Sequence, residues 1–429
     1  MAKTYRPYVP EQDLLLPPSL REWLPEDHLA FFVSDLIDQL DLSAITTVYE
    51  DEERGYPPYH PVMLTTVLVY AYCVGVFSSR KIQRRLVEDV AFRVLAAGNA
   101  PDFRTIADFR KTHLTALRGF FEQVLRLARE LGAPRVGRVA LDGSKIKANA
   151  SKHKAMSYGR MRDKQRQLRE EVKQLLDQAE AVDAAEDAEY GPDRRGDELP
   201  AELQRRESRL KRIREAKRAL EARAKDEAAA GGQPAESVKP DPKAQYNFTD
   251  PESRIMKGPD GFVQAYNVQV AVDDLQLIVG QAVTQETNDK KQLLPMIATI
   301  EQQSGDTPDH LLADAGYCSD DNLTAIAHTT IDAYISTRKQ KHGERPGPCP
   351  RGPLPKTATI VDRMSRKLLT KTGAAAYAAR KGIVEPVIGQ IKQARGFRQF
   401  LLRGFEQVQG EWSLVCTTHN ILKLYRLCV

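Results

Sequence analysis

The chain has few cysteines and no motif that would pair them. Its 429 residues contain no C-x-x-C spacing, and the five cysteines are scattered: Cys73, Cys318, Cys349, Cys416 and Cys428. This pattern argues against a disulfide framework and against a zinc ribbon, and it favours a reducing compartment. The histidines show neither H-x-x-x-H nor H-E-x-x-H spacing, so no histidine-based metal motif is indicated.

Long apolar runs are also missing. No uninterrupted apolar stretch reaches the roughly 18 residues that a transmembrane helix needs. The apolar run from Val62 to Phe77 is too short and predicts a buried helix instead. The start, MAKTYRPYVPEQD, has no apolar signal core. We therefore expect a soluble, cytoplasmic protein that does not contact a membrane.

A strong net charge is absent as well. Lys and Arg number 63 against 58 for Asp and Glu, an excess too small to indicate a nucleic-acid partner by itself. What matters is where the basic residues cluster. The apolar fraction of 41% allows sizeable cores, and the length predicts two or three domains.

Residues 1–135 are predicted to form a helical domain, because apolar residues recur there every three or four positions. Pro61 predicts a helix start, and Thr105 with Asp108 resembles a capping box. Two helices joined by a short turn would form a helix-turn-helix that binds DNA. An ordinary solvated helical bundle is the equally weighted alternative. The polar faces of these helices carry Lys81, Arg84, Arg85, Arg104, Arg110 and Lys111.

Residues 151–243 are predicted to be an inserted charged helical hairpin followed by a linker. Two charged helical stretches flank the breaker YGPDRRGDELP, and sparse Leu and Ile supply only a thin apolar stripe. The hairpin is expected to act as a dimerisation arm or a DNA-gripping arm.

The remaining segments, 136–150 and 244–429, are predicted to form an α+β catalytic domain with a mixed sheet. VGRVAL reads as a strand that ends at Asp142, and a hairpin turning at Asp273 and Asp274 follows the insertion. A helical segment and the strand DHLLADAG come next. This β–β–β–helix–β order is the layout of a ribonuclease-H-like domain.

Three acids are candidate metal ligands. Asp142 and Asp314 each follow an apolar run, and Glu385 lies in a segment with helical spacing. Carboxylates are hard oxygen ligands for Mg²⁺, and two such ions can activate a nucleophile and neutralise a phosphate. Each acid also has a structural interpretation. Either Asp could belong to a turn, and Glu385, just before Pro386, could sit at a helix start.

Basic residues surround these acids. Lys392 lies about two helical turns after Glu385, on the same face, where it could clamp a phosphate. In ARGFRQFLLRGFEQ, arginine alternates with Phe397, Phe400 and Phe405, as in a surface that grips a nucleic-acid backbone. Trp23 and Trp412 are predicted to be core residues. The candidate DNA-binding residues near the acids are Lys145, Lys147, Tyr377, Arg380, Lys392, Arg395, Arg398 and Arg403.

The strings LDGSKIKANAS, ADAGYCSDDN, VEPVIGQIKQARGFRQFLLRG and GEWSLVCTTHNILKL resemble DDE-type transposases of bacterial insertion sequences. The resemblance covers nearly the whole chain and is closest to the eleven-eighty-two group. It implies a ribonuclease-H-like core, two Mg²⁺ ions for which Mn²⁺ can substitute, and cut-and-join chemistry at terminal inverted repeats. The family triad maps onto Asp142, Asp314 and Glu385.

The family signature around the glutamate has Tyr, Arg, Glu and Lys, matched here by Tyr377, Arg380, Glu385 and Lys392. The gap between Arg and Glu is one residue longer than in the widest form of the signature, so either Arg380 or Lys381 takes the arginine's place. We expect double-stranded DNA as partner and a homodimer on DNA. Two alternatives are a nuclease that hydrolyses without joining and an inactive DNA-binding regulator.

Overall fold

The computed structural model describes residues 19–50, 57–133, 135–190, 201–230, 234, 238–258, 261–338 and 347–428. Most of the predicted breaker and linker around the hairpin lies outside these residues. Within the described part, no helix combines the length and apolarity that crossing a membrane requires. All five cysteines are free thiols.

The first part of the chain is helical, as predicted. Pro61 begins α3, and the break at Asn99 to Pro101 separates α5 from α6. The elements are η1 (Leu20–Trp23), α1 (Leu29–Asp38), α2 (Ser43–Glu50), α3 (Pro61–Cys73), α4 (Ser79–Glu88), α5 (Val90–Leu95), α6 (Phe103–Thr112) and α7 (Leu114–Glu130).

Two local predictions in this part are wrong. The side chain that caps α6 is Asp102, which accepts the backbone N–H groups of Arg104 and Thr105, so Thr105 is not the capping residue. An aspartate that can accept from two N–H groups is a strong N-cap and fixes the start of the helix. Trp23 is 54% exposed and therefore does not anchor the core, whereas Trp412 is 2% exposed and does.

The predicted catalytic domain is built on a mixed six-stranded sheet in the order β4-β5-β1-β7-β8, with β6 pairing to β5. β5 is antiparallel to β1 and β6, while β7 is parallel to β1 and β8 is parallel to β7. This is a ribonuclease-H-like arrangement and confirms the predicted fold. The strands are β1 (Arg138–Lys147), β4 (Arg254–Gly258), β5 (Gly261–Asp273), β6 (Ile278–Thr284), β7 (His310–Ala313) and β8 (Asp332–Ile335).

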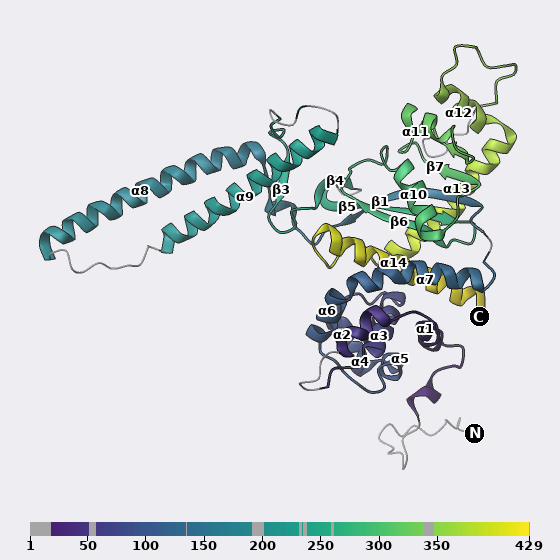
Figure 1. Cartoon of the computed structure of the whole chain (residues 1–429), viewed down its shortest axis with the longest axis horizontal. Helices are drawn as coiled ribbons and strands as arrows, with labels where there is room; N and C mark the ends of the chain where they lie inside the picture. Colours follow the sequence, from purple (N-terminus) through teal and green to yellow (C-terminus); the bar gives the residue numbers. More distant parts are fainter. Residues whose placement is uncertain are drawn as a thin grey trace, which may run out of the picture.

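The helices around the sheet include the predicted α10 and a long C-terminal helix. α10 (Leu293–Ser304) packs on β6, and α11 (Asp320–Ile326) follows β7. α12 (Ile360–Leu369) leads into α13 (Lys371–Gly389) and the π-helix η4 (Gln390–Ala394). α14 (Phe405–Cys428) lies between the sheet and the N-terminal helices (Figure 1).

Pro386 lies inside α13, so the interpretation of Glu385 as a residue at a helix start is wrong. A proline has no N–H to donate, which leaves the carbonyl of Gly382, four residues earlier, without its helical partner. The side chain of Gln276 donates to that carbonyl at 3.0 Å. The turn between β5 and β6 thus compensates for the break in the helical ladder and fixes α13 against the sheet.

The inserted hairpin is present as two long helices, α8 (Tyr158–Tyr190) and α9 (Ala201–Ala230), which project from the rest of the molecule (Figure 1). Its base is closed by a small sheet of β2 (Ala155–Ser157) and β3 (Gln245–Asn247), preceded by η2 (Lys152–Lys154). A separate small apolar cluster at this base contains Met161, Leu168, Leu210, Ile213, Ala216 and Leu220.

One continuous core joins the N-terminal helices to the sheet. Its polar centre is Glu411 on α14, which is fully buried and accepts the N–H groups of Leu401 and Leu402. Tyr72 on α3 donates to Glu411, and Arg110 on α6 donates to the hydroxyl of Tyr72. The N-terminal helices are therefore fastened to the catalytic domain through a buried polar network.

Candidate active site

Asp142 and Asp314 come from two neighbouring parallel strands. The paired register of β1 and β7 ends at Ala140 opposite Leu312, and each aspartate lies two positions further on. Parallel strands are about 4.8 Å apart, and residues in register face the same side of the sheet. The sequence predicted that β1 ends at Asp142, which is wrong, because β1 continues to Lys147 along β5. What ends there is its partner β7, and this exposes the β1 edge beside Asp142.

Arg380 on α13 lies over this pair. Its Nη1 atom is 3.8 Å from Oδ2 of Asp142, and its side chain is 11% exposed. Burial raises the pKa of Asp142 to about 6; Arg380 opposes the rise and the nearby Asp314 adds to it. Lys381 is exposed, so of the two candidates for the signature arginine it is Arg380 that lies beside Asp142, and its role in the signature stays a prediction.

Gly143 is needed for close packing rather than for a turn. A Cβ atom at Gly143 would lie 2.5 Å from Oδ1 of Asp289 and 2.6 Å from Nε2 of Gln269. Such distances do not occur between real Cβ atoms and their neighbours, so any other residue at position 143 would force the side chains of Asp289 and Gln269 to move. Asp289 precedes α10, and its carboxylate also lies close to Gly316, next to Asp314. No sequence pattern identifies Asp289 as a site residue, and the glycine after Asp142 is the only signal of its position.

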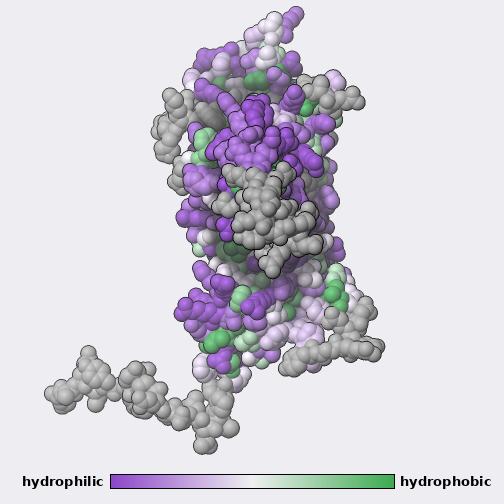
Figure 2. All heavy atoms as spheres, turned by 90° about the vertical axis from the view of Figure 1, so that its left-hand side faces the viewer, coloured by the Kyte–Doolittle hydropathy of each residue, from purple (hydrophilic) through white to green (hydrophobic). Residues whose placement is uncertain are grey.

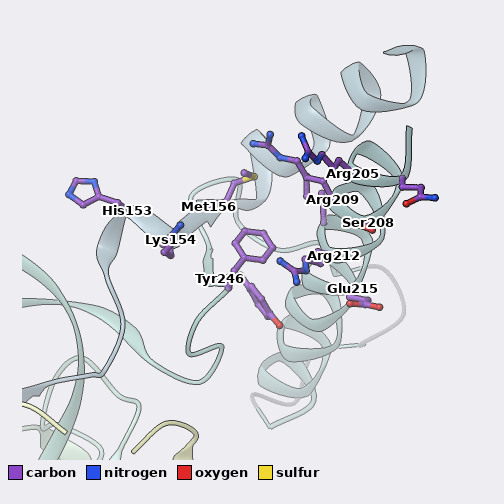
Figure 3. Close-up of a pocket in the computed structure, with 13 residues that line it drawn as sticks. His153, Lys154, Met156, Arg205, Ser208, Arg209, Arg212, Glu215 and Tyr246 are labelled. Atoms are coloured by element: carbon purple, nitrogen blue, oxygen red, sulfur yellow. The ribbon is translucent and has the colours of Figure 1, made fainter. Parts of the chain in front are cut away.

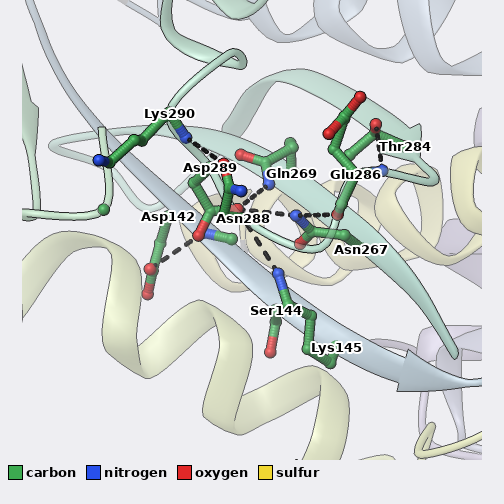
Figure 4. Close-up of polar contacts among 12 residues, drawn as sticks. Asp142, Ser144, Lys145, Asn267, Gln269, Thr284, Glu286, Asn288, Asp289 and Lys290 are labelled. Atoms are coloured by element: carbon green, nitrogen blue, oxygen red, sulfur yellow. Dashed lines mark hydrogen bonds and ion pairs between the residues drawn. The ribbon is translucent and has the colours of Figure 1, made fainter. Parts of the chain in front are cut away.

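A polar network holds Asp289 in place (Figure 4). Asn267 and Gln269 on β5 donate to Oδ1 of Asp289 at 2.8 and 2.7 Å. Lys145 lies 3.7 Å from the same oxygen. The buried hydroxyl of Tyr317 donates to Oε1 of the Gln269 side chain. This bond orients the side-chain amide so that its NH₂ group faces Asp289. This network ties β5, β1 and the segment after β7 together behind the acidic pair.

Three of the four residues of the predicted signature lie near Asp142. Burial opposes the shift, but Asp142 and the nearby Tyr377 raise the pKa of Arg380. Lys392 donates from Nζ to the hydroxyl of Ser144 at 3.0 Å and to the carbonyl of Lys145 at 3.3 Å. Burial lowers the pKa of Lys392. The nearby positive charge of Arg398 lowers it further, while Asp142 opposes the shift. Tyr377, Arg380 and Lys392 therefore surround the Asp142 end of the site.

Glu385 is exposed on α13. Among the described residues it makes no hydrogen bond or ion pair with Asp142 or Asp314. Likewise, within that part of the chain, no group of three or more His, Cys, Asp or Glu residues is arranged to hold a metal ion. The structure thus brings the two aspartates together, and the convergence of Glu385 with them stays a prediction.

The donor set nevertheless fits a hard cation. Asp142 accepts the Gly143 N–H at 3.0 Å and Asp314 accepts the Gly316 N–H at 2.8 Å, which leaves further lone pairs on both carboxylates. The buried Nη1 of Arg380 has no hydrogen-bond partner. Mg²⁺ is often held by one or two protein carboxylates, with substrate phosphate and water completing its shell.

Two predicted DNA contacts point inward instead. Arg110 is 6% exposed and donates to Tyr72 and to the carbonyl of Phe77, so it has no surface to offer DNA. The guanidinium of Arg395 donates to Thr418 and to the Val415 carbonyl on α14. The phenylalanines predicted to alternate with arginine on a gripping surface belong to the core or pack against it: Phe397, Phe400 and Phe405. An arginine–aromatic alternation in a loop that caps a core was mistaken for a surface pattern.

The other predicted contacts remain accessible. Lys147, Arg398 and Arg403 are exposed next to one another, because Lys147 donates its N–H to the Arg398 carbonyl and Arg403 donates to the Asn149 carbonyl. Arg84, Arg85 and Arg104 are exposed on α4 and α6, although Arg84 pairs with Glu88 and Arg85 with Asp89. These acids reduce the net positive charge that α4 presents.

Two family models match the chain. Residues 18–112 match a model described as "Transposase domain (DUF772)", and residues 237–421 match one described as "Transposase DDE domain". The second match contains β4 to β8 together with Asp314, Glu385 and most of α14. Neither the curated proteins nor the solved structures gave a match.

Proposed function

The chain is a DDE-type transposase, and we propose that it cleaves DNA at the terminal inverted repeats of an insertion sequence and joins the freed 3′ ends to target DNA. The observation that carries the proposal is the pair Asp142 and Asp314, level with each other on adjacent parallel strands under the buried Arg380. In this arrangement two acids and one cation surround the position that a scissile phosphate would occupy.

The reaction consists of two phosphoryl transfers. In the first, water attacks the phosphate at an element end, and the P–O bond to the 3′ oxygen breaks. In the second, the resulting 3′-hydroxyl attacks a target phosphodiester, so one P–O bond forms as another breaks. Each step develops negative charge on the phosphate oxygens, which positioned cations stabilise.

We assign roles to this chain's own residues. Asp142, Asp314 and Glu385 would hold divalent metal ions, which the family generally uses, with Mg²⁺ as the ion we propose. Such ions supply charge neutralisation and an activated oxygen nucleophile. Arg380 is held where it can contact a non-bridging phosphate oxygen, because its Nη1 lies 3.8 Å from Asp142 and has no hydrogen-bond partner of its own. Lys392 fixes β1 at Ser144 and keeps a positive charge beside Asp142.

The proposal includes a homodimer on DNA, because two element ends must be brought together before joining. It also places the protein in the cytoplasm, where free thiols persist and DNA is accessible.

The test is a strand-transfer assay with labelled DNA from the ends of the element that encodes the chain. Wild type should give joined products in Mg²⁺ or Mn²⁺. Asp142→Ala should bind the same DNA but neither nick nor join it. Nicked product without joined product would favour a nuclease, and unchanged cleavage by Asp142→Ala would remove that residue from the mechanism.

A further inference from the structure

A cavity of about 1050 Å³ lies at the base of the hairpin (Figure 3), and neither Asp142 nor Asp314 is among its lining residues. One wall is α9, from which Arg205, Arg209 and Arg212 line the cavity. Lys154 lines it from the segment before β2. Tyr246 on β3 lines it from the wall that faces α9. We propose that this basic cleft binds the phosphate backbone of duplex DNA that flanks the cleavage site.

The charge of the cleft fits a polyanion. Four cationic side chains line it, and Glu215 is the single carboxylate among its described lining residues. In the described part of the chain, Arg205, Arg209 and Arg212 form no ion pair, and all three are exposed. Unpaired arginines on an open wall attract phosphate without first having to break an internal salt bridge.

The spacing of the arginines fits a DNA strand. Positions 205, 209 and 212 are separated by four and three residues, so the three side chains share one face of α9. They span about 10.5 Å along the helix axis at 1.5 Å per residue. Successive phosphates of one DNA strand advance about 3.4 Å along the duplex axis, so the span of the three arginines equals about three phosphate-to-phosphate steps, a run of about four phosphates.

The cleft is rigid enough to hold this geometry. Leu210 and Ile213 on α9 are buried in the small apolar cluster at the hairpin base, and Tyr246 packs against that cluster. Tyr158 donates to Glu221 at 2.8 Å, which ties the start of α8 to α9. Because the arginines alternate with these buried positions, packing of the hairpin base orients them toward the cleft.

The cleft is also connected to the active site. β1 continues from Asp142 to Lys147, about 17 Å at 3.3 Å per residue, and residues 148–151 then connect it to η2 at the cleft. The exposed Lys147, Arg398 and Arg403 lie at this junction. Figure 2, which views the molecule from the hairpin side, shows mainly hydrophilic residues on the coloured surface. Such a surface suits a wet, polar DNA interface rather than an apolar protein partner.

The test compares two triple variants of the full chain that remove the same charge from α9. The cleft variant is Arg205→Gln, Arg209→Gln and Arg212→Gln. The matched control changes exposed cations of α9 that do not line the cleft: Lys211→Gln, Arg214→Gln and Arg218→Gln. Binding of a fluorescent duplex of arbitrary sequence is measured by anisotropy between about 50 and 200 mM salt, where phosphate contacts dominate the salt dependence.

Each lost phosphate contact lowers the slope of log K against log salt by about 0.9, so the cleft variant should lose about 2.7. The control should lose less than about 1. Equal losses in the two variants, or a change of oligomeric state without a change in DNA affinity, would overturn the assignment. If the cleft variant does not fold, the arginines of the wild-type protein are modified with phenylglyoxal in the presence and absence of duplex, and the protection of each arginine is compared. Bound duplex should protect Arg205, Arg209 and Arg212 but not Arg214 and Arg218; equal protection would overturn the assignment.

The cleft assignment rests on the proposed function only in taking DNA as the substrate. Wild type that neither binds nor cleaves DNA would contradict the proposed function. Wild type that binds and cleaves DNA, with both triple variants behaving alike, would contradict only the cleft.

Discussion

Replacing Asp142 with asparagine should make the metal-free protein more stable while it abolishes DNA cleavage. The side chain is 21% exposed, and burial raises its pKa to about 6 from the ordinary 3.8. A carboxyl whose pKa is raised on folding contributes stability at low pH, and that contribution is lost as pH rises through the folded pKa. Above about pH 6 the ionised Asp142 therefore destabilises the folded state.

The size of the effect follows from the shift. The pKa of Asp142 is about 2.2 higher in the folded than in the unfolded state, which corresponds to a free energy of about 3 kcal/mol near pH 7, at 1.36 kcal/mol per pKa unit. At about pH 5 the same linkage leaves about 1.6 kcal/mol, because the folded state then takes up a proton. With an unfolding entropy of about 2.1 cal/mol/K per residue, 3 kcal/mol shifts the melting temperature of this chain by about 3 °C.

The assay is thermal unfolding of wild type and Asp142→Asn in EDTA at the two pH values. The variant should melt about 3 °C higher at neutral pH and gain about half as much at the lower pH. Mg²⁺ at about 100 times its Kd should then stabilise wild type by about 2.7 kcal/mol and the variant by much less. Asp273→Asn is the matched control, because burial also raises the pKa of Asp273 to about 6 but at the β5–β6 turn. The control should keep both activity and the Mg²⁺ response. An Asp142→Asn protein that is no more stable than wild type at neutral pH would refute the reasoning.

Three further predictions concern single positions. Glu385→Gln should abolish cleavage, whereas Asp289→Asn should keep measurable activity with a raised Mn²⁺ requirement. Cleavage by both variants is measured as a function of metal concentration. If Asp289→Asn is inactive and Glu385→Gln is active, Asp289 is the third metal ligand. Gly143→Ala should cost about 1–3 kcal/mol by overpacking against Asp289, while Gly382→Ala, which meets nothing within 4 Å, should gain up to about 1 kcal/mol in denaturant unfolding. Arg110→Met should lower stability by about 3–5 kcal/mol without weakening DNA binding by the folded fraction; a loss of affinity at unchanged stability would restore it as a DNA contact.

The order of strands and helices in the catalytic domain was predictable because each element has its own periodicity. The runs around β5, β6 and α10 alternate or repeat with clear periods, and turn residues separate them. β4 and β8 were not predicted, because β4 is short and contains a lysine and a glycine, and β8 has only four residues. Short edge elements of this kind are defined by their partners more than by their own residues.

The acidic pair was predictable in kind but not in geometry. Asp142 was placed at a strand end, since Asp-Gly usually marks a turn. The extent of pairing with β7 decides the outcome, and a sequence does not show where a neighbouring strand stops. Asp289 was missed for the same reason, because its proximity to Gly143 is a contact across 146 positions. Arg110 and Arg395 were assigned to the surface because arginine is rarely buried, and both are held inside by backbone carbonyls and hydroxyls.

The most direct test of the central claim is to locate Mn²⁺ by anomalous diffraction in crystals of the protein with bound end DNA. A two-metal site predicts an ion ligated by both Asp142 and Asp314 and a second ion in contact with Glu385, with the scissile phosphate beside Arg380. Ions that bind elsewhere, or an Asp142 carboxylate that contacts no ion, would contradict it.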